Sequence, residues 1–312
     1  MGYVGIDLGA TNVRAAVGDG TGTMIASARA ATPEGTIGNA VTEAVLDVVR
    51  EVCERAGVVP TTIDGATIGA MGRLDVDAGT VSVSSNLDVC DGTIPLVDPL
   101  SSLLDTDAVV LRSDTQVGAI GEHVRVYPDI ESLVYLTISS GIGAGVIADG
   151  QLLSGRNNNA GEVGHQTIDC GGFMTCGCGL DGHWEAYCAG ENVPRFARAL
   201  YEADPVETSL PIEDDLDAAT VFEHAETDAF ADRVVERVAE LNVVGVANVV
   251  HAYDPEIVVF GGAVAVENPA RVVEPVRERL PSALVVDPPA IAVAELGDRA
   301  GLVGALAIAS TE

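Results

Sequence analysis

The most informative segment of the chain is residues 138–185, which read ISSGIGAGVIADGQLLSGRNNNAGEVGHQTIDCGGFMTCGCGLDGHWE. It begins with a glycine-rich turn between two apolar runs, a pattern that indicates a tight connection between two strands. An acidic residue and a histidine follow, at Glu162 and His165. The remainder is rich in cysteine, histidine and glycine, so we expect a loop that can bind a metal ion.

Four side chains of this stretch are candidate metal ligands, and they are His165, Cys176, Cys178 and His183. They lie within nineteen residues, and the glycines between them let a loop fold around an ion. Two thiolates and two imidazoles suit the closed tetrahedral shell of a structural zinc site, which orders a loop rather than doing chemistry. The alternative is that the cysteines are ordinary loop thiols, because thiolate pairs with one intervening residue are less common at zinc sites.

A second glycine-cornered hairpin is predicted near the amino terminus, where residues 3–17 read YVGIDLGATNVRAAV. Backbone amides at its corner can cradle a phosphate, and Asp7 can reach the Mg²⁺ that accompanies a phosphate. Many glycine hairpins bind nothing, but two such corners in one chain can clamp one polyphosphate. The candidate residues of the two corners are Gly9, Ala10, Thr11 and Asn12 in the first, and Ser140, Gly141 and Gly143 in the second.

Two strand ends carry further candidates. Gly261 and Gly262 follow a short apolar run, where the backbone can approach a planar ligand closely, or where the chain simply turns from a strand into a helix. Asp114 follows the apolar run 108–111, and a carboxylate there faces the crevice at the carboxyl edge of an α/β sheet. Asp114 is therefore either a general base or the N-cap of the helix predicted over 115–125.

Composition narrows the class of protein. The chain has 312 residues, enough for two domains, with a formal net charge of −31, and all 16 basic residues are arginine. So acidic a chain repels nucleic acid and anionic membranes, and we expect neither as a partner. Because salt screens self-repulsion, we interpret the excess of acids as adaptation to a salty cytoplasm. Six scattered cysteines, with no recognisable signal peptide, lipidation motif or membrane-spanning run, favour a reducing, cytoplasmic location.

Apolar periodicity predicts strands that alternate with helices, which defines an α/β fold. Besides the hairpin at 3–17, strands are expected over 67–71, 108–111, 134–139, 144–148, 257–260 and 291–293. Helices are expected over 37–52, 115–125, 228–253 and 301–309, and the acidic segment 202–217 is expected to be a loop. The two glycine-cornered hairpins suggest a duplicated architecture.

At this point the sequence shows a resemblance to a known family. Residues 138–165 resemble the signature of the ROK family of sugar kinases and repressors, and CGCGLDGHWE at 176–185 resembles that family's zinc loop. Further segments are similar to ROK segments in the same order along the chain: GIDLGATN at 5–12, SNL at 85–87, SDTQVGAIGE at 113–122, ANVVHAYDPEIVVFGGAV at 247–264 and GLVGALAIA at 301–309.

The resemblance implies an actin-like ATPase fold, with two domains built on ribonuclease-H-like sheets and a cleft between them. We expect a small domain of residues 1–113 plus about 295–312 and a larger domain of 114–294 that holds the zinc loop. The resemblance further implies ATP and Mg²⁺ as phosphoryl donor and cofactor, structural Zn²⁺, and a homodimer.

Carried over position by position, the resemblance makes Asp114 the general base that accepts the proton of a sugar hydroxyl. The residues implied to bind the sugar are Asn86, Glu162, His165 and Glu185. His165 would ligate zinc through one ring nitrogen and offer the other to the sugar. Two positions depart from the family pattern, since Ser113 replaces a sugar-binding asparagine and His183 replaces a cysteine ligand. Cys170 is a less well-spaced substitute ligand.

These implications predict an ATP-dependent glucokinase. Ser113 leaves the hexose open, so a fructokinase or an N-acetylhexosamine kinase is the alternative, and ADP or polyphosphate remain possible donors. Outside the enzyme class, the alternatives are a sugar-responsive repressor and a non-catalytic sugar-binding protein. The first is disfavoured by the acidic charge and by the hairpin that begins at Tyr3, which leaves no room for a preceding DNA-binding domain.

Overall fold

The computed structural model describes residues 2–33, 38–82 and 93–311, and the chain divides into two compact units. The first unit comprises Met1–Glu131, Gly145–Gly161 and Glu295–Glu312, and the second comprises Ser132–Ala144 and Glu162–Ala294. The carboxyl terminus therefore returns to the amino-terminal unit. Residues 114–131 and 145–161 also group with the first unit, which differs from the boundary after residue 113 expected from the sequence.

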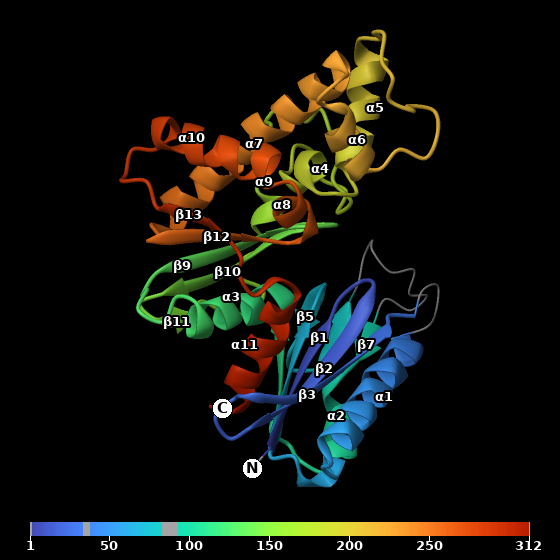
Figure 1. Ribbon diagram of the computed structural model, residues 1–312, viewed down its shortest axis with the longest axis vertical. Helices are drawn as coiled ribbons and strands as arrows, with labels where there is room; N and C mark the ends of the chain where they lie inside the picture. Colours follow the sequence, from blue (N-terminus) through green and yellow to red (C-terminus); the bar gives the residue numbers. More distant parts are fainter. Residues whose placement is uncertain (1, 34–37, 83–92, 312) are drawn as a thin grey trace. The chain divides into compact units, whose positions relative to one another are not determined.

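The first unit is built on a five-stranded sheet with the order β3-β2-β1-β4-β8. Neighbours β1, β2 and β3 are antiparallel, whereas β4 and β8 continue the sheet in parallel with β1 (Figure 1). The strands are β1 (Gly2–Leu8), β2 (Asn12–Asp19), β3 (Met24–Ala31), β4 (Gly65–Ala70) and β8 (Val109–Ser113). The remaining elements of this unit are α1 (Gly38–Ala56), η1 (Pro60–Thr62), α2 (Val97–Leu104), α3 (Asp114–Arg125), η3 (Gly297–Arg299), α11 (Ala300–Ala309), and a small sheet of β5 (Arg73–Asp75), β6 (Thr80–Ser82) and β7 (Thr93–Pro95).

Alternation along β1 separates the two faces of this sheet. Val4, Ile6 and Leu8 are fully buried in the cluster that also holds the apolar face of α1. That face repeats at helical spacing through Val41, Val45, Val48 and Val52. The intervening residues of β1, including Asp7, lie on the face covered by α11 (Figure 1). Because side chains alternate along the strand, the Asp7 carboxylate lies in the interior of the unit, beside the first turn of α11.

Close packing between α3 and α11 explains why residues after 113 belong to the first unit. A Cβ atom built on Gly304 would lie 1.7 Å from the Val117 carbonyl oxygen, so only glycine permits this approach of the two helices. Sequence periodicity predicts both helices but not the contact between them. The boundary expected after residue 113 therefore assigned α3 and α11 to different domains, although the two helices pack together.

The second five-stranded sheet repeats the plan of the first, with the order β11-β10-β9-β12-β13. Its strands are β9 (Leu133–Ile138), β10 (Ile142–Ala148), β11 (Gln151–Leu152), β12 (Ile257–Gly261) and β13 (Ala290–Val293), and β12 is parallel to both β9 and β13. Two sheets with the same strand order confirm the duplicated α/β architecture predicted from the two hairpins.

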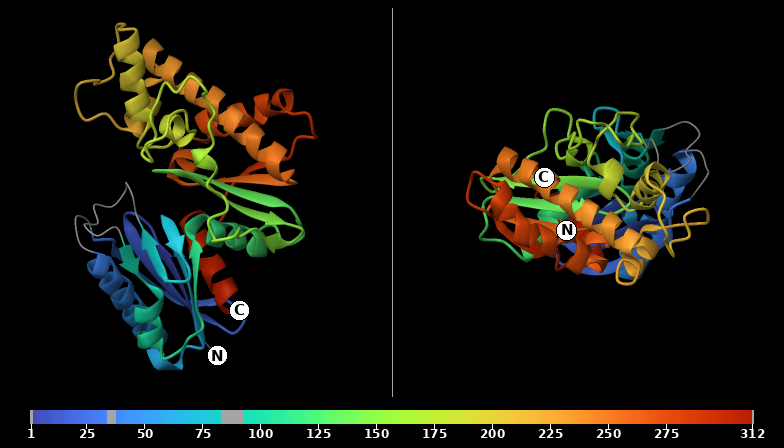
Figure 2. Two further views of the ribbon diagram at one scale, coloured as in Figure 1. Left: turned by 180° about the vertical axis from the view of Figure 1, so that it is seen from behind. Right: turned by 90° about the horizontal axis from the view of Figure 1, so that it is seen from above.

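The other elements of the second unit are largely helical. They are η2 (Val163–His165), α4 (Glu185–Cys188), α5 (Val193–Ala203), α6 (Ala218–His224), α7 (Ala229–Tyr253), α8 (Ala263–Glu267), α9 (Pro269–Val272) and α10 (Glu274–Ala283). The long helix α7 packs against α9 and α10, as the two views in Figure 2 show in orange and red. Asp228 caps α7 through bonds from the Phe230 and Ala231 amides and also binds Ser209, which ties the acidic segment to the helix.

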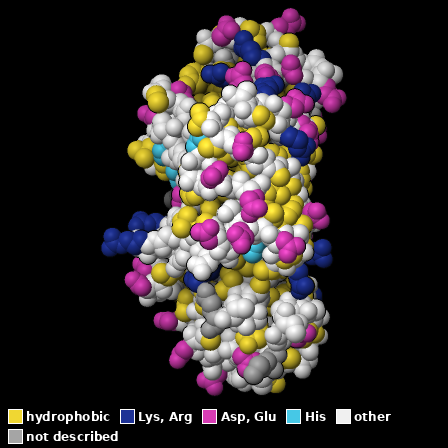
Figure 3. All heavy atoms as spheres, turned by 90° about the vertical axis from the view of Figure 1, so that its left-hand side faces the viewer, with side chains coloured by type: hydrophobic (Ala, Val, Ile, Leu, Met, Phe, Trp, Pro, Cys, Tyr) yellow, Lys and Arg dark blue, Asp and Glu magenta, His cyan; other side chains and the backbone are white. Residues whose placement is uncertain are grey.

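The sequence-based elements agree with the structure to within a few residues at their ends. The structure adds elements that were not predicted, among them β3, α2, α5, α6 and the small sheet. Within the described part of the chain, no helix is long and apolar enough to cross a membrane. Acidic side chains are spread over the face drawn in Figure 3, as the net charge requires.

Candidate active site and metal centre

Two carboxylates define the candidate catalytic region of the first unit. Asp7 lies on β1, and Asp114 begins α3 directly after β8. The pKa of Asp7 is raised to about 6, mainly by burial and also by the nearby charge of Asp114, while Arg14 opposes both effects. A buried carboxylate with a second carboxylate close to it is an oxygen-rich environment, and oxygen atoms are the ligands that Mg²⁺ prefers. Asp7 therefore fits the metal-binding role predicted from the sequence.

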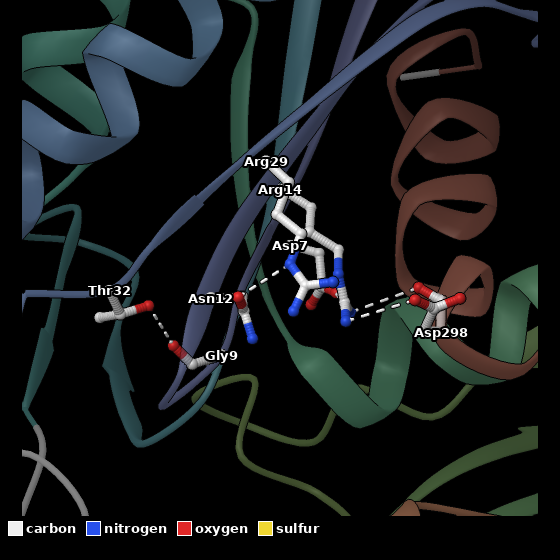
Figure 4. Close-up of polar contacts among 7 residues, drawn as sticks. All are labelled: Asp7, Gly9, Asn12, Arg14, Arg29, Thr32 and Asp298. Atoms are coloured by element: carbon white, nitrogen blue, oxygen red, sulfur yellow. Dashed lines mark hydrogen bonds and ion pairs between the residues drawn. The ribbon is translucent and has the colours of Figure 1, made fainter.

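Arg14 holds the Asp7 carboxylate in place. Its Nη1 atom lies 3.2 Å from Asp7 Oδ2, and its Nη2 atom lies 3.5 Å from Asp298 Oδ2 (Figure 4). The two residues are cross-strand partners in the β1–β2 register, which places their side chains on one face. Arg14 was not predicted as a site residue. Its place on the second strand of the first hairpin, opposite Asp7, was the signal that could have identified it.

A glycine is required beside Asp7. A Cβ atom at Gly301 would lie 2.9 Å from Asp7 Cγ, closer than real Cβ contacts. The first turn of α11 can approach the carboxylate only because this residue has no side chain. The segment GLVGALAIA at 301–309, which resembles a ROK segment, therefore contributes to the site because its first residue, Gly301, has no side chain.

Ser113, and not Asp114, is the N-cap of α3. The Ser113 Oγ atom accepts a hydrogen bond of 3.2 Å from the Gln116 amide, and Ser113 has extended backbone angles. Asp114 is the first residue of the helix, and its Oδ1 atom accepts a bond of 2.8 Å from the Thr115 amide. The alternative interpretation of Asp114 as a simple helix cap is therefore wrong, because the preceding serine already performs that function.

The first glycine corner is tighter than expected. The Gly9 amide donates to the Asn12 carbonyl oxygen at 3.0 Å, so this amide is used inside the turn. Thr32, the residue after β3, donates through Oγ1 to the Gly9 carbonyl oxygen at 2.8 Å and holds the corner in place (Figure 4). Among the described residues, no acceptor is found for the amides of Ala10 and Thr11. These two amides remain as candidate phosphate donors.

The four predicted metal ligands come together in the second unit. One ligand atom from each of His165, Cys176, Cys178 and His183 lies within 4.8 Å of the others. His165 Nδ1 is 3.7 Å from Cys176 Sγ, and His183 Nδ1 is 3.3 Å from Cys178 Sγ. Zinc bonds of ordinary length in a tetrahedral shell separate a nitrogen and a sulfur ligand by about 3.6 Å. The donor types and spacings therefore fit zinc.

Electrostatics at this cluster agree with metal binding. Burial lowers the pKa of His183, which keeps its imidazole in the neutral form that can act as a ligand. Burial raises the pKa of the Cys176 thiol to about 11, so this thiol would have to release its proton when a metal ion binds. Cys170 is exposed and does not belong to the cluster, so its role as a substitute ligand has no geometric support.

Two carboxylates lie against the cluster. Glu162 Oε2 is 3.8 Å from His165 Nε2, the ring nitrogen opposite the one that faces Cys176. Glu185 Oε1 is 3.8 Å from Cys176 Sγ, and Glu185 Oε2 accepts a bond of 2.9 Å from the Ile142 amide. Glu185 therefore connects the metal loop to the second glycine corner. This orientation leaves His165 Nε2 and Glu162 as candidate hydroxyl-binding groups on one side of the cluster.

Buried polar contacts fix the loop that carries the ligands. Tyr187 is buried and donates to Asp169 Oδ2 at 2.6 Å, while it accepts a bond of 3.0 Å from the Met174 amide. Trp184, which follows the ligand His183, is fully buried, and its Nε1 atom donates to Asn242 Oδ1 of α7 at 2.9 Å. These contacts were not predicted from the sequence, because they depend on how the loop folds on itself and on its packing against α7.

The second and third glycine segments lie side by side. In the parallel register of β9 and β12, Gly261 pairs with Thr137. Gly262 follows with φ +82°, packed on the backbone of Ile138. The Ser139 carbonyl oxygen also accepts a bond of 2.7 Å from the Gly190 amide, next to the metal loop. The second unit thus gathers both glycine segments and the metal cluster, including the predicted residues Ser140, Gly141 and Gly143.

Several other asparagine, cysteine and histidine residues are not among the residues assigned to the carboxylate pair or the metal cluster. Asn86 and Cys90 lie outside the described residues. Cys53 and Cys188 are buried and do not belong to the metal cluster. His123, His224 and His251 bond to the backbone near Ile130, Thr220 and Val285.

Comparison with known proteins agrees with these observations. Residues 3–312 match the ROK family, so the chain belongs to the ROK family and has its two-domain, actin-like kinase fold. A glucokinase from Pyrobaculum calidifontis is 34% identical over 308 residues, which are 98% of this chain and 94% of that protein.

Two solved structures are similar over their whole length. A ROK hexokinase from Thermus thermophilus has a TM-score of 0.83 and 32% identity, covering 99% of this chain and 98% of its own. A ROK glucokinase from Streptomyces griseus, in complex with glucose and AMPPNP, has a TM-score of 0.78 and 27% identity, with full coverage of both chains.

Proposed function

We propose that this protein is an ATP-dependent hexose kinase that phosphorylates the 6-hydroxyl group of glucose. The observation that carries the proposal is the pair Asp7 and Asp114, with Asp114 at the carboxyl end of a parallel strand and Asp7 raised in pKa beside it. Family membership and the named activities of the relatives support the same reaction. Fructose and N-acetylhexosamines are the alternative substrates.

In the proposed mechanism, Asp114 accepts the proton of the attacking hydroxyl group. The sugar oxygen then forms a bond to the γ-phosphorus atom, and the bond from that phosphorus to the bridging oxygen breaks to release ADP. A positioned general base contributes about 10²–10⁴ in rate. Mg²⁺, when bound, neutralises charge on the phosphates, and Asp7 is the residue of this chain that would hold it. The free amides of Ala10 and Thr11 would orient a phosphate.

Sugar recognition is assigned to the metal loop of the second unit. We propose that Zn²⁺ occupies the His₂Cys₂ cluster and fixes the orientation of His165, whose Nε2 atom and the Glu162 carboxylate bind sugar hydroxyl groups. Glu185 joins them from the other side of Cys176. Asn86 and Ser113 remain proposed sugar contacts on grounds of resemblance alone, and the bond from Gln116 already occupies Ser113.

Three further properties belong to the proposal. The acidic composition supports function in a salty cytoplasm, the resemblance supports a homodimer, and ATP is preferred over ADP or polyphosphate as the donor.

The proposal is tested with Asp114→Asn and with Asp107→Asn as the matched control, because Asp107 is exposed on the same unit. Both variants and the unaltered protein are assayed with Mg-ATP, Mg-ADP and polyphosphate against a panel of hexoses in molar potassium chloride. We expect Asp114→Asn to lose phosphoryl transfer at least 10²-fold while it still binds glucose, and Asp107→Asn to remain active. Absence of transfer to any hexose by the unaltered protein would refute the kinase.

A further inference from the structure

Four of the 16 arginines gather around one open pocket of the first unit. The pocket has a volume of about 220 Å³. Its charged and hydroxyl-bearing lining residues are Arg14, Ser27, Arg29, Arg55, Asp298 and Arg299. These residues come from β2, β3, the end of α1 and the segment before α11, so the tertiary structure alone brings them together.

The side chains that line this pocket are mainly positively charged, whereas the protein as a whole is strongly negative. Acidic residues outnumber basic ones 47 to 16 in the chain, yet arginines outnumber acids four to one among the lining residues. Elsewhere on the first unit an arginine such as Arg50 lies between acidic neighbours of its own helix. A chain with so few cations gains little from placing four of them together, because like charges repel unless an anion joins them.

The guanidinium groups are only partly neutralised by the protein. Arg14 contacts Asp7 and Asp298, and Arg55 contacts Glu51 and the Ser27 carbonyl oxygen. Arg29 bonds through Nε to the neutral amide oxygen of Asn12 at 2.8 Å (Figure 4). For Arg299, no side-chain partner is found among the described residues. Arg29 and Arg299 therefore have no described carboxylate partner and can bind an external anion.

The strand register places the pocket beside the proposed nucleotide site but distinct from it. Asp7, Arg14 and Arg29 pair in one row across β1, β2 and β3. Two strand spacings, about 10 Å, separate Asp7 from Arg29 at the edge of the sheet. Arg14 lies between them, because it forms an ion pair with Asp7 and also lines the arginine pocket. An anion held by Arg29 and Arg299 would thus lie outward from the carboxylate proposed to hold Mg²⁺.

We propose that this arginine pocket is a binding site for a phosphate dianion, carried either by inorganic phosphate or by a small phosphate monoester. Guanidinium groups recognise phosphate through paired charge-assisted hydrogen bonds, and Arg is preferred where such planar recognition is needed. The pocket is smaller than the 300–1,000 Å³ typical of sites for drug-sized ligands, so it suits a compact anion rather than a nucleotide. This site does not depend on the proposed kinase activity.

Binding is tested by isothermal titration of the intact protein with inorganic phosphate, with glucose 6-phosphate as the monoester and with sulfate as a charge control. The titrations use the lowest potassium chloride concentration that keeps the protein folded, without and with saturating Mg-AMPPNP. The variants are Arg29→Ser and Arg299→Ser. Arg50→Ser is the matched control, because it removes an arginine of the same unit outside the pocket.

We expect saturable binding of one phosphate group per chain that persists in the presence of Mg-AMPPNP. Each pocket variant should weaken that binding about tenfold, and the Arg50→Ser control should not change it. The two phosphate sources are distinguished by which titrant binds more tightly. No saturable binding, complete displacement by Mg-AMPPNP, equal affinity in all variants, or sulfate binding as tightly as phosphate would overturn the proposal.

Discussion

Asp7 and Arg14 are cross-strand neighbours on β1 and β2, with Asp7 Oδ2 3.2 Å from Arg14 Nη1. This one ion pair does not offset the cost of burying Asp7 beside Asp114, because the pKa of Asp7 still rises from 3.8 to about 6. A carboxylate kept in an unfavourable environment is typical of a site that becomes stable only when a cation binds.

Replacement of Asp7 by asparagine should stabilise the protein when no metal or nucleotide is bound. The folded pKa exceeds the unfolded value, so the folded state binds more protons and loses stability as pH rises from 3.8 to about 6. Asp7→Asn removes this loss. We expect a gain of about 1–3 kcal/mol near pH 7.5 and no gain near pH 3.8, measured by denaturant unfolding in molar potassium chloride. Phosphoryl transfer should also be lost in Asp7→Asn. If the variant were less stable than the unaltered protein near pH 7.5, the interpretation of Asp7 as a destabilising buried carboxylate would be wrong.

Alanine at position 301 should be harmful, although alanine is ordinarily more favourable than glycine in a helix by up to about 1 kcal/mol. Its Cβ atom would collide with the Asp7 carboxyl group. We expect Gly301→Ala to lower kcat/KM at least about tenfold and to lower stability. In an Asp7→Ala background the stability loss should shrink, because the colliding group is gone, and a double-mutant cycle measures this coupling. Additive effects would show that the two residues do not interact.

Metal content should depend on the four clustered side chains and on no other cysteine. We expect about one zinc per chain in the purified protein and in Cys170→Ser, and a clear loss in His183→Ala, measured by elemental mass spectrometry. Removal of the metal with a chelator should loosen the 165–185 loop, which hydrogen exchange can follow. A zinc-free preparation with full activity and an ordered loop would disprove the structural role.

The hydroxyl group of Tyr187 should contribute to stability. Tyr187→Phe leaves the Met174 amide and the Asp169 carboxylate without their buried partner. Losing these bonds costs about 1–3 kcal/mol, measured as the change in unfolding free energy. Tyr201→Phe is the matched control, since no hydrogen bond of the Tyr201 hydroxyl group is found among the described residues. Equal effects of the two substitutions would show that the bonds at Tyr187 are not stabilising.

Stability should increase with potassium chloride concentration. A net charge of −31 repels itself, and the Debye length falls from about 10 Å to about 3 Å between 0.1 M and 1 M salt. We expect Tm to rise over this range, and to rise less with a nonionic solute of equal osmolality. A Tm independent of salt would remove the argument for adaptation to a salty cytoplasm.

The features that are local in the chain could be predicted from the amino-acid pattern alone. Both glycine corners, the main helices and the four metal ligands could be predicted because their partners lie within nineteen residues or repeat at a helical or strand period. The choice between cap and base at Asp114 could not be made, since it depends on the rotamer of Ser113.

The features that join residues far apart in the chain became evident only from the packing of the helices and strands. Packing of α11 against β1 places Gly301 on Asp7, and the register of three strands together with the end of α1 collects the arginine pocket. Contacts over such separations depend on how whole elements pack, and a pattern of neighbouring residues carries no information about that packing. The charge of the chain was therefore evident from its composition, but the gathering of four arginines around one pocket was not.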